Sequence, residues 1–346
     1  MSMSGTRSVV TYRSGLTDSS RWQGFPFRPG DIVISTPEKC GTTRVQIICA
    51  LLIFQSPALP APLTRLSPWL DMRLRPAGDV LAVLAAQRHR RFIKTRTPLD
   101  GLPESPGVTV VTVGRDPRDV AVSADHHRCD LDRDVIESLL TRTAVRRAPC
   151  AADSDARRAR PADRRGRLLQ WIHDDAPPTE HLDSLRATVA HLGGAWARRH
   201  EPGVVVLHHG DLTRDLDGAM RLLADRLGIT VPAHRWAALV DAAALGEMRA
   251  RAAPGGRHGL AADSRAASRS GMPGQWRDSL TVDDLDSYDR RLRSLASPGL
   301  IGWLEHGTGG RRGRVGWSGA VGIVAQHQDR DVVAGFLHRE AERRSA

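Results

Sequence analysis

The feature that most constrains the fold of this chain is a short apolar run followed by a tight turn. The chain reads Asp31-Ile-Val-Ile-Ser35 and continues as Thr36-Pro-Glu-Lys-Cys-Gly-Thr-Thr43, after which apolar residues recur at helical spacing. A buried strand, a turn and a helix in this order are typical of a parallel sheet covered by helices. Backbone N–H groups of such a turn and of the helix N-terminus can converge on an anion, and Gly41 would permit its close approach. A helix cap would explain the threonines equally well.

Strand and helix patterns alternate along the rest of the chain. Strands are predicted at 91–95, 108–113 and 204–207, and helices at 119–127, 181–199, 212–227 and 284–306. This alternation predicts an α/β fold in which a central parallel sheet is flanked by helices. One domain is expected over residues 1–308, with mobile surface segments at 146–167 and 251–269, where arginine, alanine and glycine dominate. The sequence assigns no role to the glycine- and arginine-rich tail at 309–346.

Charge and composition narrow the class of partner. The chain has a formal net charge of +11, and 40% of its residues are hydrophobic, which suits a globular protein. An excess of positive charge favours acidic partners, such as nucleic acid, an anionic membrane or a phosphorylated small molecule. Of the 50 lysines and arginines, only Lys39 and Lys94 are lysines. Lysine presents a compact charge on a flexible stem, whereas arginine presents a planar fork. Both lysines lie in segments that we expect to belong to a functional site.

No segment of the sequence is typical of a membrane protein or of a metal site. The chain opens without a basic leader and apolar stretch, and its most apolar run, Val45–Phe54, is too short to span a bilayer. The cysteines have neither metal-site nor disulfide-framework spacing; they are Cys40, Cys49, Cys129 and Cys150. We therefore expect a cytoplasmic protein with reduced thiols, no membrane span and no metal.

Several motifs, in the correct order along the chain, resemble those of the cytosolic-type sulfotransferases. The chain is most similar in kind to a bacterial or actinobacterial-like member of that family. The motifs are Lys39-Cys-Gly-Thr-Thr43 for the 5′-phosphosulfate loop, Gly114–Ser123 for the second donor segment, Arg269-Ser-Gly271 with Gly274-Gln-Trp276 for the C-terminal nucleotide-binding motif, Arg91–Pro98 for the strand that carries Lys-Thr-His, and His208–Leu212 for the fourth-strand exit. The resemblance extends from about Tyr12 to Gly307. It implies a P-loop-like three-layer fold and the donor 3′-phosphoadenosine-5′-phosphosulfate (PAPS).

The resemblance also assigns a donor site to residues of these motifs. Thr42 and Thr43 would hold the 5′-phosphate, whereas Arg115 and Ser123, with Arg269, would hold the 3′-phosphate. Arginine suits a phosphate because its fork meets the oxygens in a bidentate way. A strand-end salt bridge with Asp116 or Asp119 is the alternative for Arg115. The full implied set is Lys39, Cys40, Gly41, Thr42, Thr43, Arg44, Arg115, Ser123, His209, Leu245, Arg269, Ser270 and Gly271.

The implied reaction moves a sulfuryl group from PAPS to a hydroxyl or amine of a small-molecule acceptor, without a metal. Such a transfer asks the protein mainly for positioning and for stabilisation of charge. Lys39 would neutralise the bridging oxygen as the sulfur–oxygen bond breaks, and Lys94 could support the transferring group or the departing phosphate. Lys94 could equally be a strand-end lysine that extends to solvent.

Arg96, the third implied catalytic position, is the departure from the family pattern with the largest consequence. The family has a histidine here, which takes the acceptor's proton. Arginine stays protonated and cannot act as a general base, although it could bind an acidic acceptor or stabilise the sulfuryl oxygens. Three histidines could substitute for the base, but the sequence places none of them at the acceptor: His126, His127 and His209.

Further departures lie on the adenine side of the site and beside the turn. Arg44, His209 and Leu245 stand where the family has tryptophan, tyrosine and phenylalanine. Arginine and histidine can partly replace the stacking rings, and stacking of a base is worth about 1–3 kcal/mol. Glu38 adds a negative charge beside the turn, and Ser270 replaces a basic residue. The phosphate contacts are therefore largely kept, while the base and the adenine contacts are weakened.

Four functions remain open on the sequence. A working sulfotransferase is the main hypothesis, and a donor-binding homologue with weak or no turnover is the alternative. A basic nucleic-acid-binding protein is less favoured, because the arginines are dispersed and few aromatic residues accompany them. A P-loop kinase is disfavoured, because the lysine precedes the glycine in the turn and no magnesium-binding set is evident.

Overall fold

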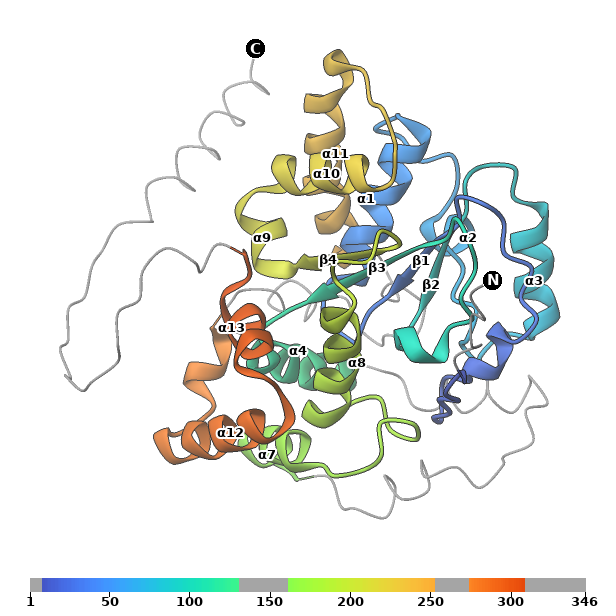
Figure 1. Cartoon of the computed structure of the whole chain (residues 1–346). Coiled ribbons are helices and arrows are strands. Elements are labelled where there is room, and N and C mark those ends of the chain that lie inside the picture. The colour runs from blue at the N-terminus through green and yellow to red at the C-terminus, as the bar shows by residue number, and fades with distance from the viewer. Residues whose placement is uncertain (1–7, 131–160, 253–273, 309–346) are drawn as a thin grey trace, which may run out of the picture. The chain divides into compact units, whose positions relative to one another are not determined.

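A four-stranded parallel sheet forms the centre of the fold, with the strands in the order β2-β1-β3-β4 (Figure 1). The computed structural model describes residues 8–130, 161–252 and 274–308. The strands are β1 (Ile32–Ser35), β2 (Phe92–Thr95), β3 (Thr109–Gly114) and β4 (Val204–His208). All four strands end at one edge of the sheet, where β1 pairs with β2 and β3 with β4. The predicted parallel sheet is confirmed, and the predicted strands match the observed bounds to within one residue.

Helices cover both faces of the sheet, which gives the predicted three-layer α/β arrangement (Figure 1). Because side chains alternate along a strand, Ile34 and Val111 face one layer while Val33 and Ile93 face the other. The first layer consists of α1 (Thr42–Phe54), α10 (Leu216–Arg226) and α11 (Trp236–Ala252). The second contains α3 (Ala77–Ala86), α4 (Pro117–Asp130) and α8 (Leu185–Ala197), with α7 (Arg164–His173), α12 (Val282–Leu295) and α13 (Pro298–His306) packed beside α4 and α8. Two short helices, α2 (Leu63–Leu66) and α9 (His209–Arg214), lie in connections.

Two of the predicted helices are each divided in two. The helix predicted at 212–227 is α9 followed by α10, because Asp215 leaves helical geometry and accepts a hydrogen bond from the Gly218 N–H at 2.8 Å. The helix predicted at 284–306 is α12 followed by α13, because Ser297 caps a new helix whose first residue, Pro298, has no N–H to continue the old one. The predictions are wrong about continuity at these two places.

The other boundaries follow from local capping. The helix predicted at 181–199 is α8, which begins only after Ser184, whose hydroxyl accepts from the Ala187 N–H. The predicted segments 146–167 and 251–269 lie mostly outside the described residues, as does the whole tail at 309–346. Residues 164–167 form the first turn of α7, with Asp163 as its N-cap, so α7 begins inside the first of these segments.

The end of β3 provides a stability test of the packing between the sheet and α13. A side chain at Gly114 would overlap the Trp303 ring, which stacks on Trp196 at a centroid distance of 5.1 Å. Gly114→Ala is therefore expected to lower the free energy of unfolding by about 1–3 kcal/mol. Gly194→Ala in α8 is the control, because nothing lies within 4 Å of the added carbon, and it is expected to stabilise by about 1 kcal/mol. Urea unfolding measures both changes; equal stability of the Gly114→Ala variant and the wild type would contradict this packing.

Candidate functional site

The turn between β1 and α1 has the backbone geometry of an anion site. Lys39 has a φ of 61°, and Gly41, the N-cap of α1, has a φ of 111°. A non-glycine residue in the left-handed region is uncommon and tends to occur at functional sites. A hydrogen bond of 2.5 Å between the hydroxyls of Thr36 and Thr42 ties the strand end to the first turn of the helix. The structure thus places the N-terminus of α1 at the edge where the strands end, as the predicted phosphate turn requires.

Two further members of the predicted donor set, Cys40 and Thr43, have buried side chains. Burial raises the pKa of the Cys40 thiol to about 12, with Glu38 adding to the shift and Arg115 opposing it. The thiol therefore stays protonated and packs in the core, so this position serves the turn through its backbone.

Arg115 connects the end of β3 to the turn. Its Nη1 donates to the Lys39 carbonyl oxygen at 3.1 Å, and its side chain is only 6% exposed. Asp116 pairs instead with Arg118 at 2.8 Å, so the adjacent aspartate is engaged elsewhere. The two segments that the sequence singles out for phosphate binding are thus in direct contact, through a buried cation.

The beginning of α4 also meets the C-terminal segment. Asp119, which is buried, accepts a hydrogen bond from the Gly274 N–H at 2.8 Å. Burial raises the pKa of Asp119, and Arg115 opposes that shift. Ser123 is buried one turn further along α4. The predicted residues Arg269, Ser270 and Gly271 lie outside the described part of the chain.

A pocket of about 360 Å³ lies beside Arg115, between α4, α9 and the short turn at Gln275–Asp278. His209 and Thr213 of α9 line it, together with Trp276. An added carbon at Gly41 would come within 3.3 Å of the His209 ring, so this glycine permits the ring to lie against the turn. Arg44 reaches the same helix and donates to the Thr213 hydroxyl at 2.9 Å. Arg44 and His209 are therefore brought together; Leu245 lies on α11, but its side chain is outside the described structure.

The exit of β2 carries the other predicted catalytic positions. The Lys94 ammonium lies 3.9 Å from the centroid of the Trp69 ring, and the Arg96 guanidinium lies 4.8 Å from the same ring. Lys94 is only 6% exposed, so it does not extend to solvent. Sequence reasoning missed Trp69, because it lies in a segment with no periodic pattern, although a tryptophan between a proline and the Leu70-Asp71 pair is itself unusual.

Asp71 fixes the backbone of this exit and was also missed. Its carboxylate accepts hydrogen bonds from the hydroxyls of Thr95 and Thr97 at 2.7 and 2.8 Å and from the Arg96 N–H at 3.2 Å. Burial raises the pKa of Asp71, while these hydrogen bonds act against the shift. Three donors from one short segment hold the backbone of Arg96 at a defined position beside the turn.

Glu38, in the turn after β1, pairs with residues at the exit of β2 and on α4. Its Oε1 lies 2.9 Å from Nη2 of Arg96 and 3.6 Å from Nε2 of His127 on α4. Burial disfavours the charged carboxylate, but the charges of Arg96, His127, Lys39 and Arg128 outweigh it and lower the pKa of Glu38 to about 2. The negative charge that the sequence places beside the turn is thus offset by cationic neighbours, of which Arg96 has the largest effect.

His191 of α8 contacts the last residue of β1, and its burial predicts that the stability of the protein depends on pH. Its Nε2 lies 2.9 Å from the Ser35 hydroxyl, and burial lowers its pKa from 6.5 to about 3. The unfolded chain therefore binds a proton below pH 6.5 that the folded protein does not bind until about pH 3, so stability falls as the pH falls through this window. His191→Gln is expected to remove about 1.4 kcal/mol per pH unit of that slope. Urea unfolding at pH 7, 6, 5 and 4 measures it; identical slopes in both proteins would contradict the assignment.

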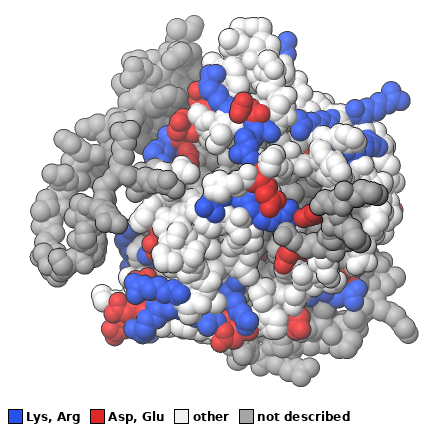
Figure 2. Space-filling model, viewed as in Figure 1, with Lys and Arg blue, Asp and Glu red and all other residues white. Residues whose placement is uncertain are grey.

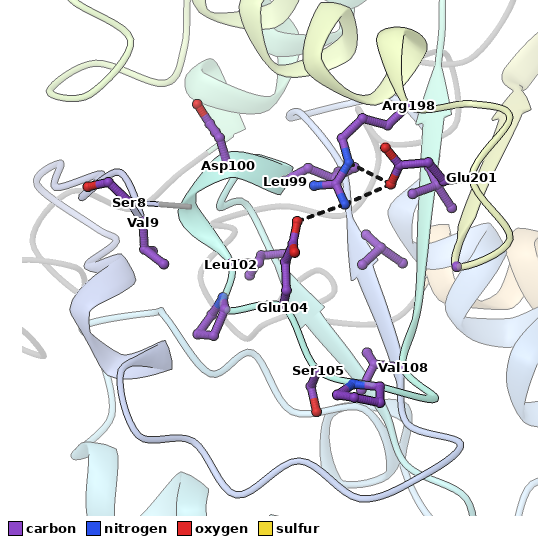
Figure 3. Close-up of a pocket in the computed structure, with 15 residues that line it drawn as sticks. Ser8, Val9, Leu99, Asp100, Leu102, Glu104, Ser105, Val108, Arg198 and Glu201 are labelled. Atoms are coloured by element: carbon purple, nitrogen blue, oxygen red, sulfur yellow. Dashed lines mark hydrogen bonds and ion pairs between the residues drawn. The ribbon is translucent and has the colours of Figure 1, made fainter. Parts of the chain in front are cut away.

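A second hollow, of about 600 Å³, lies at the opposite edge of the sheet, where β3 and β4 begin (Figure 3). Val108 and Val204 contribute apolar lining. Arg198 lies beside it and pairs with Glu104 at 3.1 Å and with Glu201 at 2.8 Å (Figure 3). The length of the sheet separates this hollow from the turn, so it is not part of the candidate site.

The charged surface is mixed rather than basic on the face shown in Figure 2, where blue and red side chains are interspersed. Ion pairs account for part of this mixing, such as Arg221 with Asp217 at 2.8 Å. The part of this face that the structure describes therefore lacks the basic patch that a nucleic-acid-binding surface would present. Over residues 8–130, 161–252 and 274–308, no group of histidine, cysteine and acidic side chains could hold a metal ion, and no helix is long and apolar enough to cross a bilayer.

Comparison with known proteins agrees with this geometry. A family profile for the sulfotransferase domain matches residues 29–297. A glycolipid sulfotransferase of Mycobacterium bovis (strain BCG / Pasteur 1173P2) is 37% identical over 315 residues, which covers 88% of this chain and 95% of the relative. A second, from Mycobacterium tuberculosis (strain ATCC 25177 / H37Ra), is 37% identical over 318 residues with the same coverage.

Solved structures share the fold at low sequence identity. Retinol dehydratase in complex with androsterone and inactive cofactor PAP has a TM-score of 0.59 at 20% identity, covering 81% of this chain and 86% of that one. A mouse sulfotransferase complexed with PAP has a TM-score of 0.58 at 17% identity, covering 82% and 90%. The residues that match the family profile include the turn, the exit of β2 and α4. The chain therefore belongs to the sulfotransferase family of enzymes.

Proposed function

We propose that this sulfotransferase takes its sulfuryl group from PAPS and transfers it to a hydroxyl of a small-molecule acceptor. The observation that carries the proposal is the buried contact between Arg115 and the Lys39 carbonyl, which joins the two predicted phosphate segments. A nucleotide with phosphate groups at its 3′ and 5′ positions needs two anion-binding centres at a defined separation, and the contact between Arg115 and the turn supports such an arrangement.

The residues present fit the donor. The turn offers left-handed backbone at Lys39 and Gly41 together with a helix N-terminus, which suits a 5′-phosphosulfate. The adjoining pocket of about 360 Å³ lies within the range of small-molecule sites. His209 lines this pocket, and Arg44 donates to the hydroxyl of Thr213, which also lines it; an imidazole ring and a guanidinium can both stack on a base. The PAP complexes of the two structural neighbours support the same donor.

The chain's own residues then have distinct tasks during transfer. When bound, PAPS supplies an activated sulfuryl group. Lys39 places a positive charge beside the turn, where negative charge develops as the bridging bond breaks. Lys94, held over Trp69, keeps a second cation at the neighbouring strand exit. Trp69 and Asp71 restrict how these groups move, so the charges are positioned before the reaction begins.

The acceptor class to test first is a glycolipid hydroxyl, because both mycobacterial relatives are named glycolipid sulfotransferases. The protein is incubated with ³⁵S-labelled PAPS and either a sugar-headed lipid or a series of phenols, and labelled product is separated by chromatography. Label transferred to an added acceptor by the wild type, and lost in Arg115→Ala, is the expected result. Binding of 3′-phosphoadenosine-5′-phosphate (PAP) without sulfuryl transfer to any acceptor would instead favour the donor-binding homologue with weak or no turnover.

A further inference from the structure

The ends of two neighbouring strands and the helix that follows a third bring Glu38, Arg96 and His127 together beside the turn. The strand order β2-β1-β3 places the exit of β1 between the other two. Glu38 belongs to that central exit, Arg96 follows β2, and His127 lies on α4, the helix that follows β3. Residues far apart in the sequence therefore converge at the one edge where the phosphate turn and the second lysine also lie.

The contacts within this group are those of an ion-paired cluster. The Glu38 carboxylate is 2.9 Å from the Arg96 guanidinium and 3.6 Å from Nε2 of His127. Glu38 is 11% exposed, whereas the His127 ring is 33% exposed and can be reached from outside. The separation of Glu38 and His127 is longer than a hydrogen bond, and catalytic hydrogen bonds are often long in unliganded proteins and shorten when substrate binds.

Neither of the other two members can accept a proton near neutral pH. The Arg96 guanidinium stays charged. With its pKa lowered to about 2 by its cationic neighbours, against the effect of burial, Glu38 is a very weak base. Histidine is the side chain whose charge changes in this range. A carboxylate beside one ring nitrogen favours a proton there, which makes the other nitrogen the basic one.

Other histidines near the site have different environments. His126 precedes His127 on α4, but its Nε2 lies 2.6 Å from Nη2 of Arg164, a group that can only donate. His209 lies against Gly41, on the pocket side of the turn. His208 shares a hydrogen bond of 3.0 Å with the Leu304 carbonyl. Among the histidines described near the turn, His127 is the one that shares an acidic partner with Arg96.

We propose that His127 is the general base of this enzyme and that Glu38 is the positioning residue that orients its ring, a role that rests on the proposed function. The acceptor oxygen forms a bond to sulfur while the bond from sulfur to the bridging oxygen breaks. The electron pair of that bond stays on the 5′-phosphate, and the acceptor proton passes to the His127 imidazole and then to solvent. Arg96, which stands where the family has its basic histidine, does not take the proton; it pairs with Glu38 and holds that carboxylate in place.

Two sets of variants test this assignment, in the full-length protein. His127→Gln removes the base, Glu38→Gln removes the orienting charge, and His126→Gln is the matched control on the same helix. PAP release from PAPS is measured with a series of phenols of increasing pKa and with water alone as acceptor, and PAP binding is measured separately by calorimetry. Charged groups around the cluster are Glu38, Lys39, Arg96 and Arg128, so the pH profiles are recorded for each variant.

His127→Gln is expected to lower turnover about 100-fold, and more for phenols of higher pKa, while PAP binding and the melting temperature stay unchanged. Glu38→Gln is expected to lower turnover about tenfold and to move the acidic limb of the pH–rate profile to lower pH, because the imidazolium loses a negative neighbour. His126→Gln is expected to match the wild type.

The outcomes separate this inference from the proposed function. If wild-type turnover persists in His127→Gln with an unaltered pH profile, the base assignment is overturned and the donor proposal stands. If the wild type binds PAP but releases none from PAPS, the base assignment is also overturned. If the wild type does not bind PAP, the proposed donor fails, and the inference fails with it.

Discussion

Arg115→Ala is expected to weaken the binding of 3′-phosphoadenosine-5′-phosphate (PAP) about 100-fold, because a buried cation with a planar donor fork is lost from the phosphate site. The guanidinium is 6% exposed and donates to the Lys39 carbonyl at 3.1 Å, so solvent cannot replace it. Binding of ADP, which has no 3′-phosphate, should change far less. Isothermal titration calorimetry of both ligands measures the two changes.

The matched control for that variant is Arg221→Ala. Arg221 lies on α10, more than half exposed, in an ion pair with Asp217, so the substitution removes the same formal charge from the surface. PAP binding by this variant is expected to equal that of the wild type. Equal weakening in both variants would mean that general charge, and not a site at Arg115, attracts the ligand.

Lys39→Asn is expected to lower turnover about 1000-fold while PAP binding falls less than about tenfold. The lysine charge acts mainly where negative charge develops, so its loss raises the barrier more than it weakens the ground-state complex. Asparagine is the replacement of choice because Lys39 has a φ of 61°, and asparagine tolerates the left-handed region better than alanine does. Rates of sulfuryl transfer and calorimetric PAP binding measure the two effects.

The fold of the Lys39→Asn variant is checked by its melting temperature, which should match the wild type. A variant that folds, binds PAP and turns over at the wild-type rate would show that Lys39 is a structural residue of the turn. Equal losses of turnover and PAP affinity would place its role in binding alone.

Much of the fold could be predicted because its signals are local. The β-branched runs at 32–35 and 109–114 are buried on both faces, and each is followed by a turn and a helix. The breaks in the helices also had local signals that the periodic pattern concealed. Ser297-Pro298 is a cap and a residue without an N–H, and Asp215 caps α10.

The site was only partly predictable because its charges pair across the sheet. In the sequence, Glu38 and Arg96 are two separate departures from the family pattern, one weakening an anion site and the other removing a base. In the structure they form one ion pair at 2.9 Å, so the charge of Arg96 offsets the negative charge that Glu38 places beside the turn. Trp69 and Asp71 were missed for a similar reason. Their partners lie on β2, more than 20 residues further along the chain, and their own segment has no regular pattern.

The measurement that tests the central claim most directly is calorimetric binding of PAP and of ADP to the wild-type protein at low and high salt. A built site with a buried arginine predicts that PAP binds at least about tenfold more tightly than ADP, and that the preference persists at high salt, because buried charges are poorly screened. Equal and weak binding of both ligands that disappears at high salt would contradict the account, since it would leave only a generally basic surface.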